Sequence, residues 1–150
     1  MPLSGHLNFQ EEGAAARLFV PDGYTLNQNK EAGSVIIYPN GTKIKRNQKP
    51  LVTFGRQWEE KVSEKTIQIS ITARSYSETA EPFGIKYHTQ EVGTSGTKRF
   101  NAGKDFKIFA FEYSVPKLVE GKNDILLIES DFDKDNLGIE IKSISVTVVE

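Results

Sequence analysis

Hydrophobic and polar side chains alternate along several segments of this chain, and a two-residue period is typical of a β-strand. In residues 66–74 (TIQISITAR), Ile67, Ile69 and Ile71 alternate with polar side chains. Residues 83–88 (FGIKYH) repeat the same rhythm. Because a strand points successive side chains to opposite faces, each segment is predicted to turn one face toward a core and the other toward water.

Two further segments are apolar on both faces. Residues 106–115 (FKIFAFEYSV) place aromatic rings on one face and Ile108 and Ala110 on the other. This pattern predicts a central strand with a covered second side. Residues 123–130 (NDILLIES) form a short continuous apolar run, which predicts a strand buried on both faces.

The last segment, residues 137–149, changes register partway. Its apolar side chains occupy odd positions as far as Ile141 and even positions from Ile144 onward. One extra residue near Lys142-Ser143 would return all of them to one face, so we expect a β-bulge or a bend there.

Turn residues separate these segments, and helix is scarce. Asn40-Gly41 tolerates positive φ and predicts a hairpin between residues 34–38 and 42–46. Asn40-Gly41-Thr42 also fits a glycosylation acceptor, although the hairpin explains it equally well. The best helix candidates are residues 8–18 and 56–64. The fold is therefore predicted to be all-β: a mostly antiparallel two-sheet β-sandwich of jelly-roll type, favoured over a barrel.

Chain length and regularity favour one domain. The chain has 150 residues, enough to bury a core unaided, and no linker or internal repeat divides it. We expect a single domain over residues 1–150. Roughly the first 50 residues are less regular and are predicted to form an arm, an edge hairpin or a contact for a homo-oligomer.

Charge and composition exclude several partners. The chain carries 19 basic and 20 acidic side chains, a net charge of −1, which gives no reason to expect nucleic acid. The basic residues 43–49 (KIKRNQK) suit an edge strand that discourages aggregation better than a phosphate site. No apolar run approaches the ~18 residues of a helical membrane span. Cysteine is absent, so thiol nucleophiles and cysteine-ligated metals are excluded.

An acidic triplet is the one candidate metal site. Asp131, Asp133 and Asp135 alternate in DFDKDN, and carboxylate oxygens are the ligands that calcium prefers. The positions of Gly138 and Lys142 exclude a helix–loop–helix calcium loop. Two interpretations remain: a sandwich-type calcium site, or a solvated connection between two strands. No other cofactor is indicated.

Catalytic signatures are missing from the sequence. His6 and His88 lack a neighbouring nucleophile motif, and no GxSxG, HExxH or phosphate-cradling glycine loop accompanies them. Adjacent acids such as Glu59-Glu60 would point apart in a strand and do not indicate glycoside hydrolysis. The sequence therefore predicts a protein that is not an enzyme.

Aromatic residues offer a better lead. Trp58 lies in a polar context, Tyr76 follows Arg74 at a strand end, and Tyr87 lies in the alternating segment 83–88. An exposed ring can stack on the apolar face of a sugar while Arg74 bonds to its hydroxyls. These four residues are the predicted ligand-binding set. The alternative for Trp58 is a ring that caps the core at one end of the sandwich.

Residues 54–150 resemble the jelly-roll carbohydrate-binding domains found beside glycosidases. An ordered series of segments carries the likeness: FGRQW before TIQISITAR, then FGIKYH, FEYSVPKLVEG, GKNDILLI and an acidic loop before LGIEIKSISV. The resemblance implies a sandwich that binds glycans through loop aromatics and polar groups, with structural calcium in some members. It assigns no ligand-binding residue in this chain.

The leading hypothesis is a non-catalytic, lectin-like domain that recognises a glycan or polysaccharide. A second hypothesis is a structural or assembly protein, such as a phage or cell-surface component, whose N-terminal segment docks on a neighbour. A third is a glycan-active enzyme that uses surface carboxylates. Deletion of residues up to about Leu18 should abolish oligomers and spare the sandwich if the second hypothesis holds.

Overall fold

The computed structural model describes residues 5–40, 49–77, 79–89, 93–117, 124–130 and 138–149, and two antiparallel sheets dominate it. The first sheet runs in the order β10-β6-β12-β4-β3, and β1 also pairs with β12. Its strands are β1 (His6–Asn8), β3 (Tyr24–Asn29), β4 (Ser34–Pro39), β6 (Thr66–Ser75), β10 (Lys107–Ser114) and β12 (Ile139–Val148).

The second sheet runs in the order β2-β5-β11-β7-β8, and β9 also pairs with β7. Its strands are β2 (Leu18–Phe19), β5 (Leu51–Thr53), β7 (Glu81–Thr89), β8 (Gly93–Thr94), β9 (Lys98–Ala102) and β11 (Ile125–Glu129). The two helical elements are the short helix α1 (Arg56–Val62) and a 3-10 turn, η1 (Ala14–Arg17). The predicted all-β sandwich with little helix is confirmed.

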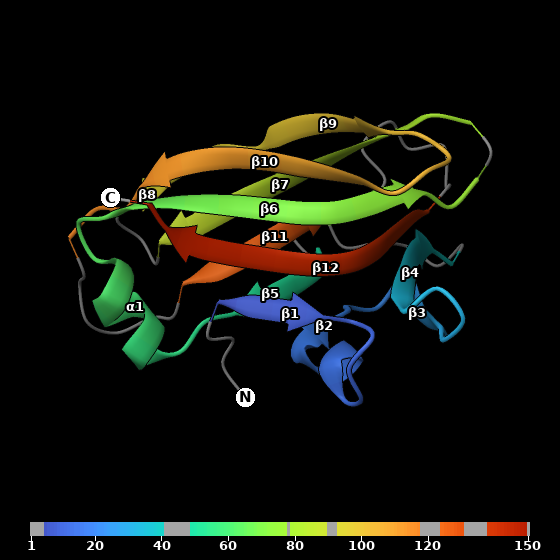
Figure 1. The fold of residues 1–150 in the computed structure, drawn as a ribbon, viewed down its shortest axis with the longest axis horizontal. Coiled ribbons are helices and arrows are strands. Elements are labelled where there is room, and N and C mark those ends of the chain that lie inside the picture. Colours follow the sequence, from blue (N-terminus) through green and yellow to red (C-terminus); the bar gives the residue numbers. More distant parts are fainter. Residues whose placement is uncertain are drawn as a thin grey trace.

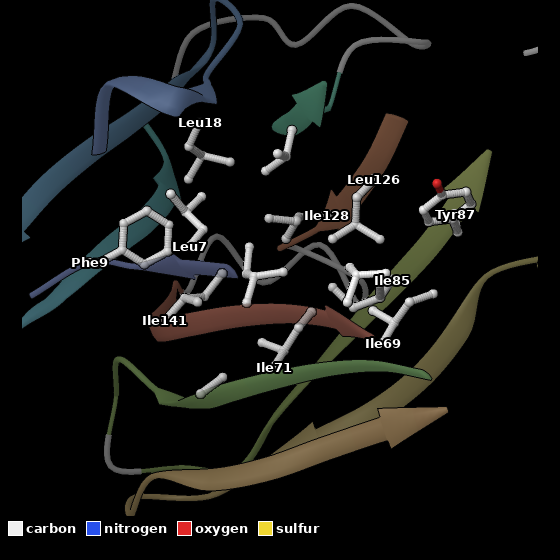
Figure 2. Close-up of a cluster of buried hydrophobic side chains, with 14 of the residues drawn as sticks. Leu7, Phe9, Leu18, Ile69, Ile71, Ile85, Tyr87, Leu126, Ile128 and Ile141 are labelled. Atoms are coloured by element: carbon white, nitrogen blue, oxygen red, sulfur yellow. The ribbon is translucent and has the colours of Figure 1, made fainter. Parts of the chain in front are cut away.

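The core lies between the two sheets (Figure 1). Alternate side chains of β6 and β12 face alternate side chains of β7 and β11 across this space, as the close-up in Figure 2 shows for Ile71, Ile85 and Leu126. Helix α1 lies at one end of the sandwich and the β3–β4 hairpin at the other (Figure 1). No helix in the described parts of the chain is long and apolar enough to cross a membrane.

Strand β12 contains the predicted bulge. Its pairing with β6 shifts register between Ile141 and Ser143. The same point separates two neighbours on the opposite edge, because Ile139–Ile141 pair with β4 whereas Ser143–Ser145 pair with β1. The bulge thus keeps the apolar side chains of β12 in the core while the strand changes partner.

The N-terminal segment is an integral part of the sandwich. The side chains of Leu7, Phe9 and Leu18 are buried in the common core (Figure 2). Residues 24–39 form an edge hairpin, one of the three roles expected for this region. A deletion up to Leu18 would remove strand β1 and these buried side chains, so it would not spare the sandwich, contrary to the sequence-based expectation.

The structure corrects the prediction for residues 106–115. Strand β10 is an edge strand of the first sheet, and Ile108 on its outer face is 73% exposed. Its inner aromatic rings are half-buried against the neighbouring sheet, where Phe109 lies 5.2 Å from Phe83 and 5.4 Å from Phe100, centroid to centroid. The predicted hairpin at Asn40-Gly41 and the basic residues 43–49 lie largely outside the described residues.

The buried position of Leu7 predicts a strong effect of truncation. We expect Leu7→Ala to lower the free energy of unfolding by about 2–5 kcal/mol, because it leaves a cavity between β1 and the core. Urea denaturation followed by fluorescence measures this. The control Ile108→Ala, at an exposed position, should change the free energy by less than about 0.5 kcal/mol. Equal effects of the two variants would contradict the role given to β1.

Candidate functional site

The outer face of the first sheet brings together side chains from distant parts of the sequence. Ile139 pairs with Ile37 on one side and with Ser75 on the other. Because both pairs are antiparallel, Gly138, which precedes Ile139, aligns with Tyr38 and Tyr76, which follow Ile37 and Ser75. The three residues thus form one row across three strands. The backbone N–H of Tyr76 donates to the carbonyl oxygen of Gly138 at 3.1 Å, which fixes this row.

The two tyrosine rings of this row form a pair. Their planes differ by 11° and their centroids lie 6.0 Å apart. Tyr76 is 53% exposed, and the hydroxyl of Tyr38 accepts a hydrogen bond from Asn27 at 3.2 Å. At Gly138, a Cβ atom would lie 2.8 Å from the Ile37 carbonyl oxygen and 2.9 Å from the Cβ of Tyr38. Only glycine allows this approach of the strands beneath the ring pair.

A charged row, Glu140 opposite Arg74, lies beside the tyrosine row, two residues from Gly138 on β12 and two residues from Tyr76 on β6. The Arg74 guanidinium donates two hydrogen bonds to the Glu140 carboxylate, from Nε to Oε1 at 2.9 Å and from Nη2 to Oε2 at 3.2 Å. Asn29 donates to Oε2 at 3.1 Å, and the Ser34 hydroxyl donates to the same oxygen. Both carboxylate oxygens of Glu140 are thus occupied, and its side chain is held rigidly.

This environment keeps Glu140 ionised. Burial alone would raise the pKa of the Glu140 carboxyl, because Glu140 is only 3% exposed. The hydrogen bonds from Arg74, Ser34 and Asn29, together with the Arg74 charge, outweigh burial and bring the pKa below its ordinary value. Glu140 therefore contributes stability at neutral pH that is lost as pH falls through its lowered pKa.

A hollow of about 650 Å³ opens beside the two rows. Its lining residues are Asn29, Arg74, Ser75, Tyr76, Ser77, Lys104 and Glu140. The guanidinium carbon of Arg74 lies 4.2 Å from the centroid of the Phe106 ring, and the Lys142 ammonium lies 5.2 Å from the same ring. The hollow thus combines one half-exposed aromatic ring with several hydrogen-bonding groups of fixed position, a composition suited to a polyol.

The structure unites two of the four predicted ligand-binding residues and separates the other two. Arg74 and Tyr76 both line the hollow. Trp58 and Tyr87 lie in the core, 5% and 0% exposed, so the prediction that their rings are exposed for stacking on a sugar is wrong. Trp58 caps the end of the core from α1, with its ring 5.8 Å from that of Phe54, which agrees with the alternative considered for it.

Trp58 and Tyr87 instead belong to a buried hydrogen-bond chain. The Trp58 indole N–H donates to the Tyr87 hydroxyl at 3.2 Å, and that hydroxyl donates to Asp124 Oδ2 at 2.8 Å. The backbone N–H of Asp124 donates to Glu59 Oε2 at 2.8 Å. The chain ties helix α1 to strands β7 and β11, so these residues hold the sandwich together.

Burial shifts the ionisation of two members of this chain. Burial raises the pKa of Asp124 to about 6, with a smaller rise from the charge of Glu59, although the hydrogen bond from Tyr87 opposes it. Burial also raises the pKa of the Tyr87 hydroxyl, and the neighbouring Asp124 charge adds to this. The hydroxyl therefore stays protonated and keeps donating to Asp124.

The acidic triplet Asp131, Asp133 and Asp135 lies outside the described residues, so the calcium hypothesis stays a prediction. Within the described ranges, no group of three or more His, Cys, Asp or Glu side chains is placed to hold a metal ion.

Three residues of the site are not in the predicted ligand-binding set, although Tyr38 stands out in the sequence as an aromatic residue beside a turn. Tyr38, Asn29 and Glu140 reach it through strand register, which links residues far apart in sequence. For Glu140 a local signal existed, because it is an acid flanked by the apolar Ile139 and Ile141 in a strand pattern. Such a residue on the outer face of a central strand requires a partner.

Comparison with known proteins supports the fold. No protein-family model matches the sequence, and no curated protein matches it. Among solved structures, a xylan-binding domain from carbohydrate-binding module family 22 superposes with a TM-score of 0.65 and 14% identity, over 98% of this chain and 97% of that chain. The CBM22-1 xylan-binding domain of Xyn10C from Paenibacillus barcinonensis gives 0.63 and 12%, over 100% and 99%.

A third similar structure is the module CBM6cm-2 of lichenase 5A from Cellvibrio mixtus, solved with cellotriose. Its TM-score is 0.55 at 10% identity, over the whole of both chains. At these identities the likeness shows the fold. This chain therefore has the β-sandwich fold of solved carbohydrate-binding modules, and the resemblance predicted from the sequence is confirmed at that level.

The contact at Gly138 predicts a stability cost for any side chain there. We expect Gly138→Ala to lower the free energy of unfolding by about 1–3 kcal/mol, because the new methyl group would press on the backbone of β4. The matched control is Gly103→Ala, where an added Cβ meets nothing within 4 Å. Urea denaturation compares the two variants, and an unchanged Gly138→Ala protein would contradict the close packing.

The raised pKa of Asp124 predicts a pH dependence of stability. Between about pH 4 and pH 6 the unfolded chain loses the Asp124 proton while the folded protein retains it, so the free energy of unfolding falls as pH rises. Asp124→Asn keeps an oxygen for Tyr87 and should remove this fall. Urea titrations across the range measure the slope, with the exposed Asp22→Asn as the control for net charge. A slope retained in Asp124→Asn contradicts the assignment.

Proposed function

We propose that this chain is a non-catalytic glycan-binding domain and that its ligand occupies the hollow beside Tyr76. The observation that carries the proposal is the half-exposed Tyr76 ring next to the fixed Arg74–Glu140 pair in one concavity. A sugar ring has apolar C–H faces and a polar hydroxyl edge, so it needs both kinds of group side by side.

The geometry suits recognition because its polar groups are pre-organised. Glu140 holds Arg74 and Asn29 from one side, so neither side chain has to be ordered when a ligand arrives. Groups already fixed in place lose less conformational entropy on binding. Lys104 and Ser77, which also line the hollow, add further donors for sugar hydroxyls.

The fold supports the same class of ligand. The similar modules are described as xylan-binding or were solved with cellotriose. A shared fold does not by itself transfer a ligand, so the proposal rests on the hollow and takes the fold as analogy.

The chemistry of the hollow argues for binding without catalysis. The one carboxylate among its lining residues is Glu140, which Arg74 holds ionised with both oxygens bonded. Glycoside hydrolysis uses a pair of carboxyl groups, one of them a proton donor. Glu140 has neither a free proton nor a carboxylate partner among the residues that line the hollow.

The proposal is tested with soluble plant and bacterial polysaccharides. Affinity electrophoresis and calorimetry should find at least one polysaccharide that binds, and Tyr76→Ala should weaken that binding by about tenfold or more. The matched control is Phe19→Ala, since Phe19 is 57% exposed on the other sheet. Its affinity should stay within about twofold of wild type.

Two outcomes would overturn the proposal. One is the absence of binding to every polysaccharide by the folded protein. The other is binding that Phe19→Ala abolishes and Tyr76→Ala leaves intact, which would place the ligand on the other sheet. Release of reducing sugar ends from a bound polysaccharide would contradict the non-catalytic assignment.

A further inference from the structure

A second hollow lies against the end of edge strand β3 and the turn that follows it. It measures about 460 Å³, and its lining residues are Phe9, Gln10, Glu11, Glu12, Gly13, Gln28, Asn29, Lys30, Gly33 and Ser34. Most of these side chains are exposed amides and charged groups. Phe9 is the aromatic residue in this set, and its ring is buried in the core. The hollow therefore offers hydrogen bonds and little surface for stacking.

The wall of the second hollow is well supported. The backbone N–H of Phe9 donates to the carbonyl oxygen of Lys142 at 3.1 Å, at the bulge of β12. Gln10 lies against the turn of the β3–β4 hairpin, since a Cβ on Gly33 would come within 3.1 Å of the Gln10 side chain. Gly33 has a φ of +69°, which permits this turn. The N-terminal segment and the hairpin thus enclose the hollow together.

The two hollows adjoin at Asn29, which lines both of them. Their walls are also bonded to each other, because the hydroxyl of Ser34 in the second hollow donates to Glu140 in the first. From β6, which carries Arg74, to β3, which carries Asn29, the sheet crosses three strand spacings, or about 14 Å. This span is longer than one sugar ring.

We propose that the second hollow is an additional subsite of the same ligand site. This inference rests on the proposed function. A glycan whose one ring lies on Tyr76 would continue past Asn29 and end between Gln10 and Gln28. The preferred ligand is then a chain of several sugars, held by stacking at Tyr76 and by hydrogen bonds at the far end. Single hydrogen bonds to water-exposed amides contribute modestly, so the gain should grow with chain length.

The test uses an oligosaccharide ladder, from disaccharide to hexasaccharide, prepared from the polysaccharide that binds most tightly. Calorimetry with the native chain should show affinity rising by about tenfold along the ladder. The double variant Gln10→Ala/Gln28→Ala should lose most of that rise and keep its disaccharide affinity within about twofold. The matched control is Gln68→Ala, an exposed glutamine near the opposite end of the same sheet, which should keep the whole rise.

The results separate this inference from the proposed function. Binding that depends on Tyr76 but does not strengthen with chain length overturns the subsite and leaves the proposed function standing. The subsite is also overturned if the double variant shows the same increase of affinity with chain length as the wild type. It is overturned as well if the double variant keeps its thermal midpoint but loses affinity for the disaccharide and the hexasaccharide equally. Absence of any glycan binding by the native chain overturns both.

Discussion

The register shift in β12 is the constraint on which the rest of this structure depends. A ten-residue strand can keep a continuous apolar face in a core only while its two-residue period is unbroken. Here one extra residue resets the period just where the neighbour changes from β4 to β1. The N-terminal strand can therefore join the sheet, and the residues before the bulge can present Glu140 on the outer face.

Glu140 is a costly residue for a sheet to carry. A carboxylate that is almost removed from water is tolerated only when charged and neutral donors replace its hydration. Arg74, Ser34 and Asn29 do so from three different strands or their ends. The energetic requirement of one buried acid thus brings together polar groups that lie 66 to 111 residues away from it in the sequence. A site built in this way is rigid before any ligand arrives.

Sequence reasoning found the strands well because their period is strict. Residues 66–74 and the bulge near Lys142 are such cases. The same pattern already placed Tyr87 on the face of Phe83 and Ile85, so its burial follows from the alternation and not from its neighbours in sequence. Trp58 lies within residues 56–64, one of the two predicted helical segments, and in helix α1 it shares a face with Val62, four residues away. Polar flanks alone suggested exposure.

The sequence does not reveal the order of the strands within each sheet. The two-residue period indicates which side chains share a face of a strand, but it does not indicate which strands lie beside it. For this reason the pattern of residues 106–115 predicts a central strand, whereas the segment lies at the edge of its sheet. The alignment of Tyr38, Gly138 and Tyr76 has the same origin. These residues come from three segments, and only the pairing of β4, β12 and β6 brings them into one row.

The edge position of β10 has a consequence for the solubility of the protein. Between Lys107 and Glu112 its sequence is uncharged and apolar, and Ile108 is exposed to water. Among the described residues, no strand pairs with the side of β10 opposite β6. Such a segment is a template for self-association between molecules. Lys107 and Glu112 stand at its two ends as gatekeepers, and they are the charges that oppose intermolecular strand addition while the chain is being synthesised and folded.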